Sequence, residues 1–326
     1  MGWGMELRHL KYFVAVAEEG SVTLAAERRL HTAQPSLSRQ IRDLEIEVGA
    51  ELMTRNSRGV VLTAAGKAFL EHARHALAQV EAARQAARRA ALPGERTLRL
   101  GFLSGCEPEW LPVATELLRE AYPESEISIV SKHSPQLADA LATGKLDAAF
   151  MRREENCPDL GYTLLIKEPL VVMLPSDHCL GSEAAIRLRD LAREPFIGMA
   201  DQAPVLRAIT ESHVRRSGVA LRTTHRAEYL SMAMSLVAST RAVTLLPDYA
   251  CNFLTWSVIS RPLDDEVPTI DLVLGHHKAN SSPLLRLLLA GTDELVNRVS
   301  RRRFADSGSA VTAAPHPGAP GSPGLG

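Results

Sequence analysis

Hydrophobic positions near the start of the chain repeat with the period of an α-helix in three successive segments. Residues 7–18 carry an apolar stripe, and Gly20 ends the helix that this stripe predicts. A second short helix follows, with Ser21 or Thr23 as its N-cap. After a brief polar break, residues 33–49 repeat the helical period once more. Three short helices in close succession predict a small helical domain at the N-terminus.

The third of these helices separates an apolar face from a polar one. At 100° per residue, Arg39 and Arg42 lie roughly opposite the apolar face, and Gln34 and Ser38 flank it. Pro35 fits the first turn, where its missing N–H is not needed. In the major groove, arginine can donate twice to guanine and glutamine can pair with adenine. The pattern predicts a helix-turn-helix, with a plain three-helix bundle as the alternative.

The residues that follow favour DNA binding over the plain bundle. Residues 51–63 alternate as a strand, a basic turn at 55–59 and a return strand. Such a β-wing would bring Arg55 and Arg58 beside the duplex. Four acidic residues of this region lie on the C-terminal half of the third helix or just after it, away from the end expected to contact bases.

A long helical run follows the wing. Residues 64–92 contain no proline, and Thr63 is a plausible N-cap. At about 1.5 Å per residue the helix would be roughly 40 Å long. Its apolar residues approximate a heptad seam, broken at Arg84. Packing on its own domain is the simple interpretation, but an exposed seam on so long a helix favours pairing between protomers.

Beyond residue 96 the pattern alternates between strands and helices. Strands are predicted at 97–103, 126–131, 146–151, 169–174, 196–199, 242–246 and 269–276, with helices between several of them. This β-α-β order predicts α/β units with largely parallel sheets and helices on both faces. Ligands of such folds bind beyond the carboxyl ends of strands, near helix N-termini. The turns at Ser104-Gly105 and His133-Ser134 are therefore candidate carboxylate sites, with helix capping as the alternative for each serine.

Charge qualifies this picture without excluding nucleic acid. The chain of 326 residues has a formal net charge of −1. Residues 1–96 hold 14 Lys+Arg against 11 Asp+Glu, whereas residues 97–326 hold 23 against 27. The neutral total therefore averages a basic N-terminal part and an acidic remainder.

The sequence shows no targeting, membrane-spanning or cofactor motif. Neither a secretory signal nor an apolar run of membrane-spanning length is visible, which predicts a cytoplasmic protein that does not enter a membrane. Four widely spaced cysteines indicate reduced thiols. Motifs of nucleotide-dependent, serine-hydrolase or zinc-protease enzymes are missing from the sequence, so we expect no enzyme activity, no cofactor and no metal site.

Residues 7–66 resemble the DNA-binding domain of LysR-type transcriptional regulators. The resemblance is carried by LRHLKYFVAVAEEGSVTLAAERRLHTAQPSLSRQIRDLEIEVGAELMTRNSRGVVLTAAG. Leu52-Met53 stands where the family usually has Leu-Phe. The resemblance implies base contacts from one set of side chains and phosphate or wing contacts from another. The base-contact set is Gln34, Ser38 and Arg39. Thr32 and Arg42 would contact phosphate, Arg55 would make the wing contact, and Pro35 belongs to the same DNA-binding region.

The remaining chain resembles the co-inducer domain of the same family, a pair of lobes like those of periplasmic binding proteins. Gly144-Lys145-Leu146-Asp147 matches its G-x-L-D turn, and Leu246-Pro247 matches a strand end near the cleft. The segment GFLSGCEPEWLP most resembles regulators of aromatic-compound catabolism, so the resemblance implies an organic or aromatic acid as effector. It places these residues at the interlobe cleft: Ser104, Gly105, Ser134, Arg152, Met199 and Ala200.

Together these observations predict an α+β protein in four parts. They are a winged helix-turn-helix (5–63), a linker and dimerisation helix (64–92), an effector domain (95–304) and a disordered tail (305–326). Lobe I would hold about 95–167 and 269–304, and lobe II about 168–268. The expected partners are double-stranded DNA with inverted-repeat half-sites, a small effector, and further copies in a homodimer or homotetramer. RNA polymerase is a further candidate. A constitutive DNA-binding protein whose second half only oligomerises remains the alternative.

Overall fold

A computed structural model describes residues 4–56, 59–91, 97–264 and 266–309. The chain divides into two compact units. The first comprises residues 1–95 with 142–145, and the second holds the rest. Each unit is described by itself.

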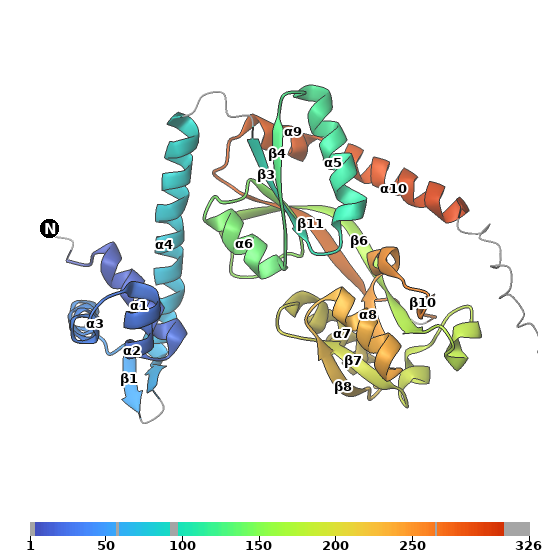
Figure 1. Ribbon diagram of the computed structural model, residues 1–326, viewed down its shortest axis with the longest axis horizontal. Helices are drawn as coiled ribbons and strands as arrows, with labels where there is room; N and C mark the ends of the chain where they lie inside the picture. Colours follow the sequence, from blue (N-terminus) through green and yellow to red (C-terminus); the bar gives the residue numbers. More distant parts are fainter. Residues whose placement is uncertain (1–3, 57–58, 92–96, 265, 310–326) are drawn as a thin grey trace, which may run out of the picture. The chain divides into compact units, whose positions relative to one another are not determined.

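The first unit opens with the three expected helical segments (Figure 1). Helix α1 (Leu7–Glu19) ends at Gly20, whose φ of 61° is left-handed. The Ser21 hydroxyl accepts a hydrogen bond from the Leu24 N–H and begins α2 (Val22–Leu24). This helix continues as the wider π-helical turn η1 (Ala25–Leu30), whose two alanines are buried. Helix α3 (Gln34–Val48) then ends at a second left-handed glycine.

The expected wing is an antiparallel hairpin of β1 (Met53–Asn56) and β2 (Gly59–Leu62). Two contacts fix its position against the helices. The Val60 N–H donates to the Gly20 carbonyl at 2.7 Å, and a Cβ at residue 59 would clash with the same oxygen. Glu45 of α3 accepts hydrogen bonds from two N–H groups at the start of β1. The hairpin is therefore anchored to both α1 and α3.

Helix α4 (Ala64–Ala91) follows the wing, and the Thr63 hydroxyl caps it by accepting from the Gly66 N–H at 2.9 Å. Its first turns pack on α1, with Phe69 edge-on to Phe13 at 5.0 Å between ring centroids. The first part of the predicted seam, including Ala73, therefore lies in the core of its own domain. The simple interpretation holds for this part of the helix.

The second unit is built on a seven-stranded mixed sheet. Its strand order is β10-β6-β11-β5-β3-β4, and β9 also pairs with β6. Only β3, β4 and β5 run parallel to one another, so the prediction of largely parallel sheets was wrong for this sheet. The long strand β6 pairs antiparallel with β9, β10 and β11. The sequence predicted only a short strand at 169–174 and did not predict this pairing. The strand bounds are β3 (Thr97–Leu103), β4 (Glu126–Lys132), β5 (Ala148–Met151), β6 (Leu160–Pro175), β9 (Thr244–Pro247), β10 (Val258–Pro262) and β11 (Thr269–His277).

Two hydrophobic clusters occupy the second unit. The first joins alternate residues of β3 to helices on one face of the sheet: α5 (Glu107–Ala121), α9 (Pro283–Ala290) and α10 (Thr292–Ser309). The other face of β3 meets α6 (Ser134–Ala142), because Leu137 lies against Gly101. The second cluster lies around the parallel pair β7 (Pro195–Met199) and β8 (Arg222–Ala227), with helices α7 (Pro204–Ser217) and α8 (Leu230–Thr240). The short helices are η2 (Cys179–Ser182), η3 (Leu188–Leu191) and η4 (Asp248–Phe253).

The end of the chain differs from expectation in its first residues. Helix α10 extends to Ser309, so residues 305–309 are helical instead of belonging to a disordered tail. The rest of that predicted tail, 310–326, lies outside the described residues. Within the described ranges, no helix combines the length and the apolar character needed to cross a membrane.

Candidate DNA and effector sites

The outward face of α3 is the candidate DNA site. Leu37, Ile41 and Leu44 are buried beneath it, as the helical period predicted. Pro35, Arg39 and Arg42 are exposed on the other side, and Gln34 is half-buried at the first turn. The structure therefore presents the amide and guanidinium groups together on one helix.

Ser38 departs from its predicted place on that surface. It is only 5% exposed, because it follows Leu37 toward the packed side of the helix. Its hydroxyl accepts a hydrogen bond from the Gln34 amide nitrogen at 3.1 Å. Its carbonyl oxygen accepts from Arg42 Nε at 3.3 Å. Ser38 is therefore buried and bonded to Gln34 and Arg42, and its predicted base contact stays a prediction.

The remaining predicted DNA-contacting residues lie on α3, in the turn before it and in the wing. Arg39 has an 80% exposed side chain, and its only close acid is Asp43 one turn later, at 3.9 Å among the described residues. An exposed pair of this kind contributes only about 0.3–0.5 kcal/mol, so Arg39 can exchange it for DNA. Thr32 is half-buried in the turn before α3, where its N–H donates to the Ala26 carbonyl. Arg55 lies in β1 opposite Val60, and Arg58 lies outside the described residues.

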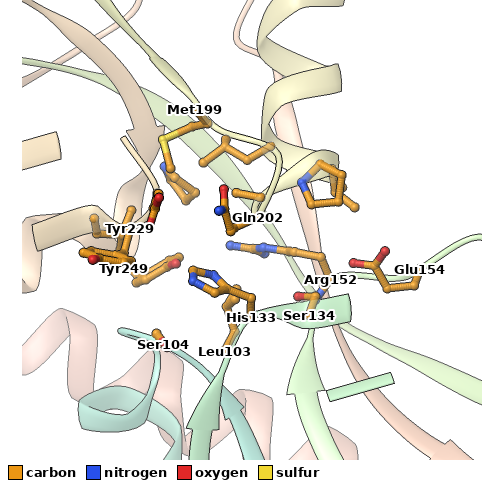
Figure 2. Close-up of a pocket in the computed structure, with 17 residues that line it drawn as sticks. Leu103, Ser104, His133, Ser134, Arg152, Glu154, Met199, Gln202, Tyr229 and Tyr249 are labelled. Carbon is orange, nitrogen blue, oxygen red and sulfur yellow. The ribbon is translucent and has the colours of Figure 1, made fainter. Parts of the chain in front are cut away.

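The candidate effector site is a pocket in the second unit (Figure 2). It lies beyond the carboxyl ends of six strands (β3, β4, β5, β7, β8 and β9) and at the starts of α6, α7 and α8, which is the location that α/β folds use for anionic ligands. Residues from both hydrophobic clusters meet there, so the pocket lies between two lobes. The lining residues used below are Ser104, His133, Ser134, Arg152, Glu154, Met199, Gln202, Tyr229 and Tyr249.

Arg152 is the only arginine among the described lining residues, and it is 4% exposed. Its Nη2 lies 2.6 Å from Glu168 Oε2, and its guanidinium stacks over Tyr249 at 5.6 Å from the ring centroid. Its Nη1 is buried and has no hydrogen-bond partner within the described chain. Figure 2 shows the guanidinium directed into the centre of the pocket. A buried cation with an unused donor is suited to an incoming carboxylate.

The two predicted serines line the pocket without capping helices in the expected way. The Ser134 hydroxyl accepts from the Arg152 N–H at 2.9 Å, which ties the start of α6 to the end of β5. The Ser104 hydroxyl accepts from Ser131 at 3.0 Å, and the residue that caps α5 is Cys106. Because each hydroxyl accepts in these bonds, its own hydrogen can still be donated.

Two predicted effector residues are not in the pocket lining. The N–H of Gly105 donates to the Glu107 carboxylate at 2.7 Å, so it is not free for a ligand. The N–H of Ala200 donates to the Ala227 carbonyl at 2.9 Å. Both backbone N–H groups are thus already used by the fold, whereas Ser104 of the first turn lines the pocket.

Sequence reasoning missed several lining side chains. Gln202 lies just before Pro204, the first residue of α7, so the rule applied to the two serines could have found it. Tyr229 stacks with His133 at 6.2 Å between ring centroids, and Tyr249 is buried after β9. No local signal distinguishes these aromatic residues, because their place depends on the packing of distant segments.

A chain of ion pairs leads away from the pocket. Glu168, which is fully buried, contacts Arg152 on one side and Arg303 of α10 on the other at 3.5 Å. Arg303 also forms an ion pair with Glu109 of α5. Burial raises the pKa of Glu168, while the two guanidinium groups oppose that rise. Arg152 is therefore linked through Glu168 and Arg303 to α10 and α5, which cover one face of the sheet.

A helix-turn-helix with a wing, a long connecting helix and a two-lobed α/β unit with an interlobe pocket are the parts of a transcription regulator that carries an effector-binding domain. The chain belongs to the LysR family. Residues 7–67 match the bacterial regulatory helix-turn-helix protein model of that family, and residues 93–294 match the LysR substrate binding domain. It is therefore a DNA-binding transcription regulator with an effector-binding domain, and not an enzyme.

Individual proteins agree with this assignment. The Hca operon transcriptional activator HcaR of Escherichia coli is 38% identical over 301 residues, 91% of this chain and 100% of the relative. The crystal structure of full-length BenM is 30% identical with a TM-score of 0.54, covering 93% of this chain and 98% of that one. Full-length CbnR complexed with its target DNA shares the fold at 23% identity and a TM-score of 0.53, covering 90% and 100%.

Proposed function

We propose that this regulator responds to a small organic acid, with an aromatic acid as the preferred class, bound between the lobes of residues 95–304. The buried Arg152 guanidinium, with its unpartnered Nη1, is the observation that carries the proposal. A carboxylate at this position would meet the guanidinium, and the Ser104 and Ser134 hydroxyls would be nearby donors. Met199 and the two tyrosines supply apolar and aromatic surface for the body of the ligand.

For DNA, we propose that Gln34 and Arg39 contact base edges, and that Thr32 and Arg42 contact phosphate. Arg55 and Arg58 would belong to the wing contact. Residues 5–63 would form the DNA-binding domain and residues 64–92 the dimerisation helix. Two such domains related by a two-fold axis would bind inverted-repeat half-sites, as a dimer or tetramer. The 80% exposed side chain of Arg39 supports its role.

The effector would act by shifting the equilibrium between lobe arrangements, which can alter the geometry of the assembled subunits. Such a shift requires that the acid bind one arrangement more tightly than the other. RNA polymerase would be the partner on which an altered assembly acts.

The test is a footprint of the full-length protein on the promoter region beside its own gene, with and without benzoate and 3-phenylpropionate. We expect protection of an inverted repeat, with boundaries or affinity that change when the acid is added. Protection that no acid changes would favour a constitutive protein whose second half only oligomerises. Lack of any protected sequence would contradict operator binding in that region.

A further inference from the structure

The carboxylate of Glu154 is an unexplained group in the lining of the effector pocket. The residue lies two positions after Arg152, just beyond β5, and is half-buried. Its Oε1 is buried and has no hydrogen-bond partner among the residues described. In Figure 2 it lies on the opposite side of the Arg152 stem from the two labelled tyrosines. The pocket thus contains an anionic group as well as a cationic one.

Three nearby polar groups of the protein make other contacts. The Tyr162 hydroxyl donates to the Glu154 backbone carbonyl at 3.5 Å, not to its carboxylate. The Arg152 N–H donates to the Ser134 hydroxyl. Arg153 stacks over the Tyr162 ring at 5.7 Å. The described contacts of these three neighbours therefore leave Oε1 without a donor.

Electrostatics adds to the same conclusion. Burial, together with Asp139 and Glu155, raises the pKa of Glu154 to about 7. A side chain whose negative charge is disfavoured by burial and by two acids is stabilised by any donor that reaches it. A buried acceptor without a donor is destabilising, and a ligand group that donates to it would remove that cost.

We infer that the effector is bifunctional: its carboxylate meets Arg152, and a second group, a hydroxyl or an ammonium, donates a hydrogen bond to Glu154 Oε1. This rests on the proposed function of the same pocket and narrows its ligand class. Glu154 is then a specificity-determining residue. It favours donor-bearing acids over acids whose far end is entirely apolar, because the apolar end would leave the carboxyl oxygen unpaired.

The test is calorimetric titration of the full-length protein at pH 8 with matched acids. The probes are benzoate, 4-hydroxybenzoate and 4-(aminomethyl)benzoate, then 3-phenylpropionate and 3-(4-hydroxyphenyl)propionate. We expect the best donor-bearing acid to bind about tenfold more tightly than its apolar parent. Glu154→Leu should abolish this preference, because neither acid then meets a carboxyl oxygen at that position. Glu155→Leu, at the exposed neighbouring position, should keep it.

Glu154→Gln distinguishes the two donors and guards against misfolding of the leucine variant. It keeps an acceptor but loses the charge, so a hydroxyl preference should persist and an ammonium preference should largely disappear. Equal binding of parent and donor-bearing acids by the wild-type protein would overturn the inference while leaving the proposed function intact. A preference that survives Glu154→Leu would also overturn it. Failure of every acid to bind would overturn the inference together with the proposed acid effector.

Discussion

The recognition helix and the effector pocket differ in how exposed their charged side chains are. On α3, Arg39 and Arg42 are exposed, and the described ion pair of Arg39 is a long surface contact with Asp43. In the pocket the central cation is buried and contacts a fully buried carboxylate at 2.6 Å. The side chains of α3 make weak contacts that binding to DNA can replace. The pocket holds a buried ion pair at a fixed position, which suits selection of a small ligand. Single substitutions should therefore have larger effects in the pocket than on the helix.

The largest expected effect is on acid binding. Arg152→Met removes the only arginine among the described lining residues, and we expect the affinity for the best-bound acid to fall by about 100-fold, on the order of 2–5 kcal/mol for a buried charged contact. Isothermal titration of the full-length protein measures this. Arg153→Met is the matched control, because Arg153 is adjacent in sequence but exposed.

Breaking a buried ion pair also affects the fold, so the variant needs a second readout. Thermal unfolding should show a loss of stability, since Glu168 keeps only its contact with Arg303. Arg152→Lys retains the charge without the planar fork and should bind acid with intermediate affinity. Wild-type affinity in a folded Arg152→Met protein would contradict the role of Arg152.

The second effect concerns the recognition helix. Arg39→Ala should weaken binding to the operator by about 1–3 kcal/mol and relax the preference at one base pair. Competition gel shifts with operator and mutated operator measure both quantities. Arg8→Ala on α1, an exposed arginine paired with Glu6, should leave specificity unchanged. Unaltered specificity in Arg39→Ala would reject a base contact by that residue.

A smaller effect is expected at Ser38. Ser38→Ala removes the hydroxyl that accepts from Gln34, which should cost about 1 kcal/mol of operator affinity. The preference at the base that Gln34 contacts should weaken with it, and Gln34→Ala combined with Ser38→Ala should cost little more than Gln34→Ala alone. Ser36→Ala, at an exposed position of the same helix, is the control. Additive effects of the two substitutions would show that Ser38 acts independently of Gln34.

The smallest effect is on stability and depends on pH. The folded pKa of Glu154 is about 7, above its ordinary value of 4.5, so between these values the folded state holds the extra proton. Stability from this group is therefore present at low pH and is lost as pH rises through 7. Glu154→Gln should raise the free energy of unfolding at pH 8 by up to about 1 kcal/mol, a limit that allows for solvent screening of a half-exposed group. Urea unfolding should show no such gain at pH 4.5.

The two regions also differ in how far the sequence predicts them. On α3 the helical period alone predicted which residues are buried and that Arg39 and Arg42 are exposed, because i, i+3 and i+4 relations are local. It missed the burial of Ser38. This residue lies at the edge of the apolar stripe, where a small rotation of the helix about its axis determines whether a side chain is buried or exposed. The wing position depends on the contact between Gly20 and Val60, which no local pattern reveals.

In the second unit, local rules predicted elements better than the site. The strand at 97–103 has the predicted bounds, and Ser104, Ser134, Arg152 and Met199 line the pocket. Gly105 lies outside the lining, and its N–H donates to the Glu107 carboxylate, which local rules did not predict. Tyr229 and Tyr249 were missed because they reach the pocket only when the two lobes are assembled. The direction of β6 and β11 likewise depends on long-range pairing.

One measurement tests whether an acid bound at Arg152 changes operator binding by the recognition helix. Operator affinity of the full-length protein is measured by fluorescence anisotropy, with and without a saturating acid chosen by titration, for the wild-type protein, Arg152→Lys and Arg153→Met. We expect the acid to shift operator affinity in the wild-type and Arg153→Met proteins. Arg152→Lys should bind the operator normally but need a much higher acid concentration for the shift. An Arg152→Lys protein that responds at the wild-type acid concentration would show that Arg152 does not bind the effector.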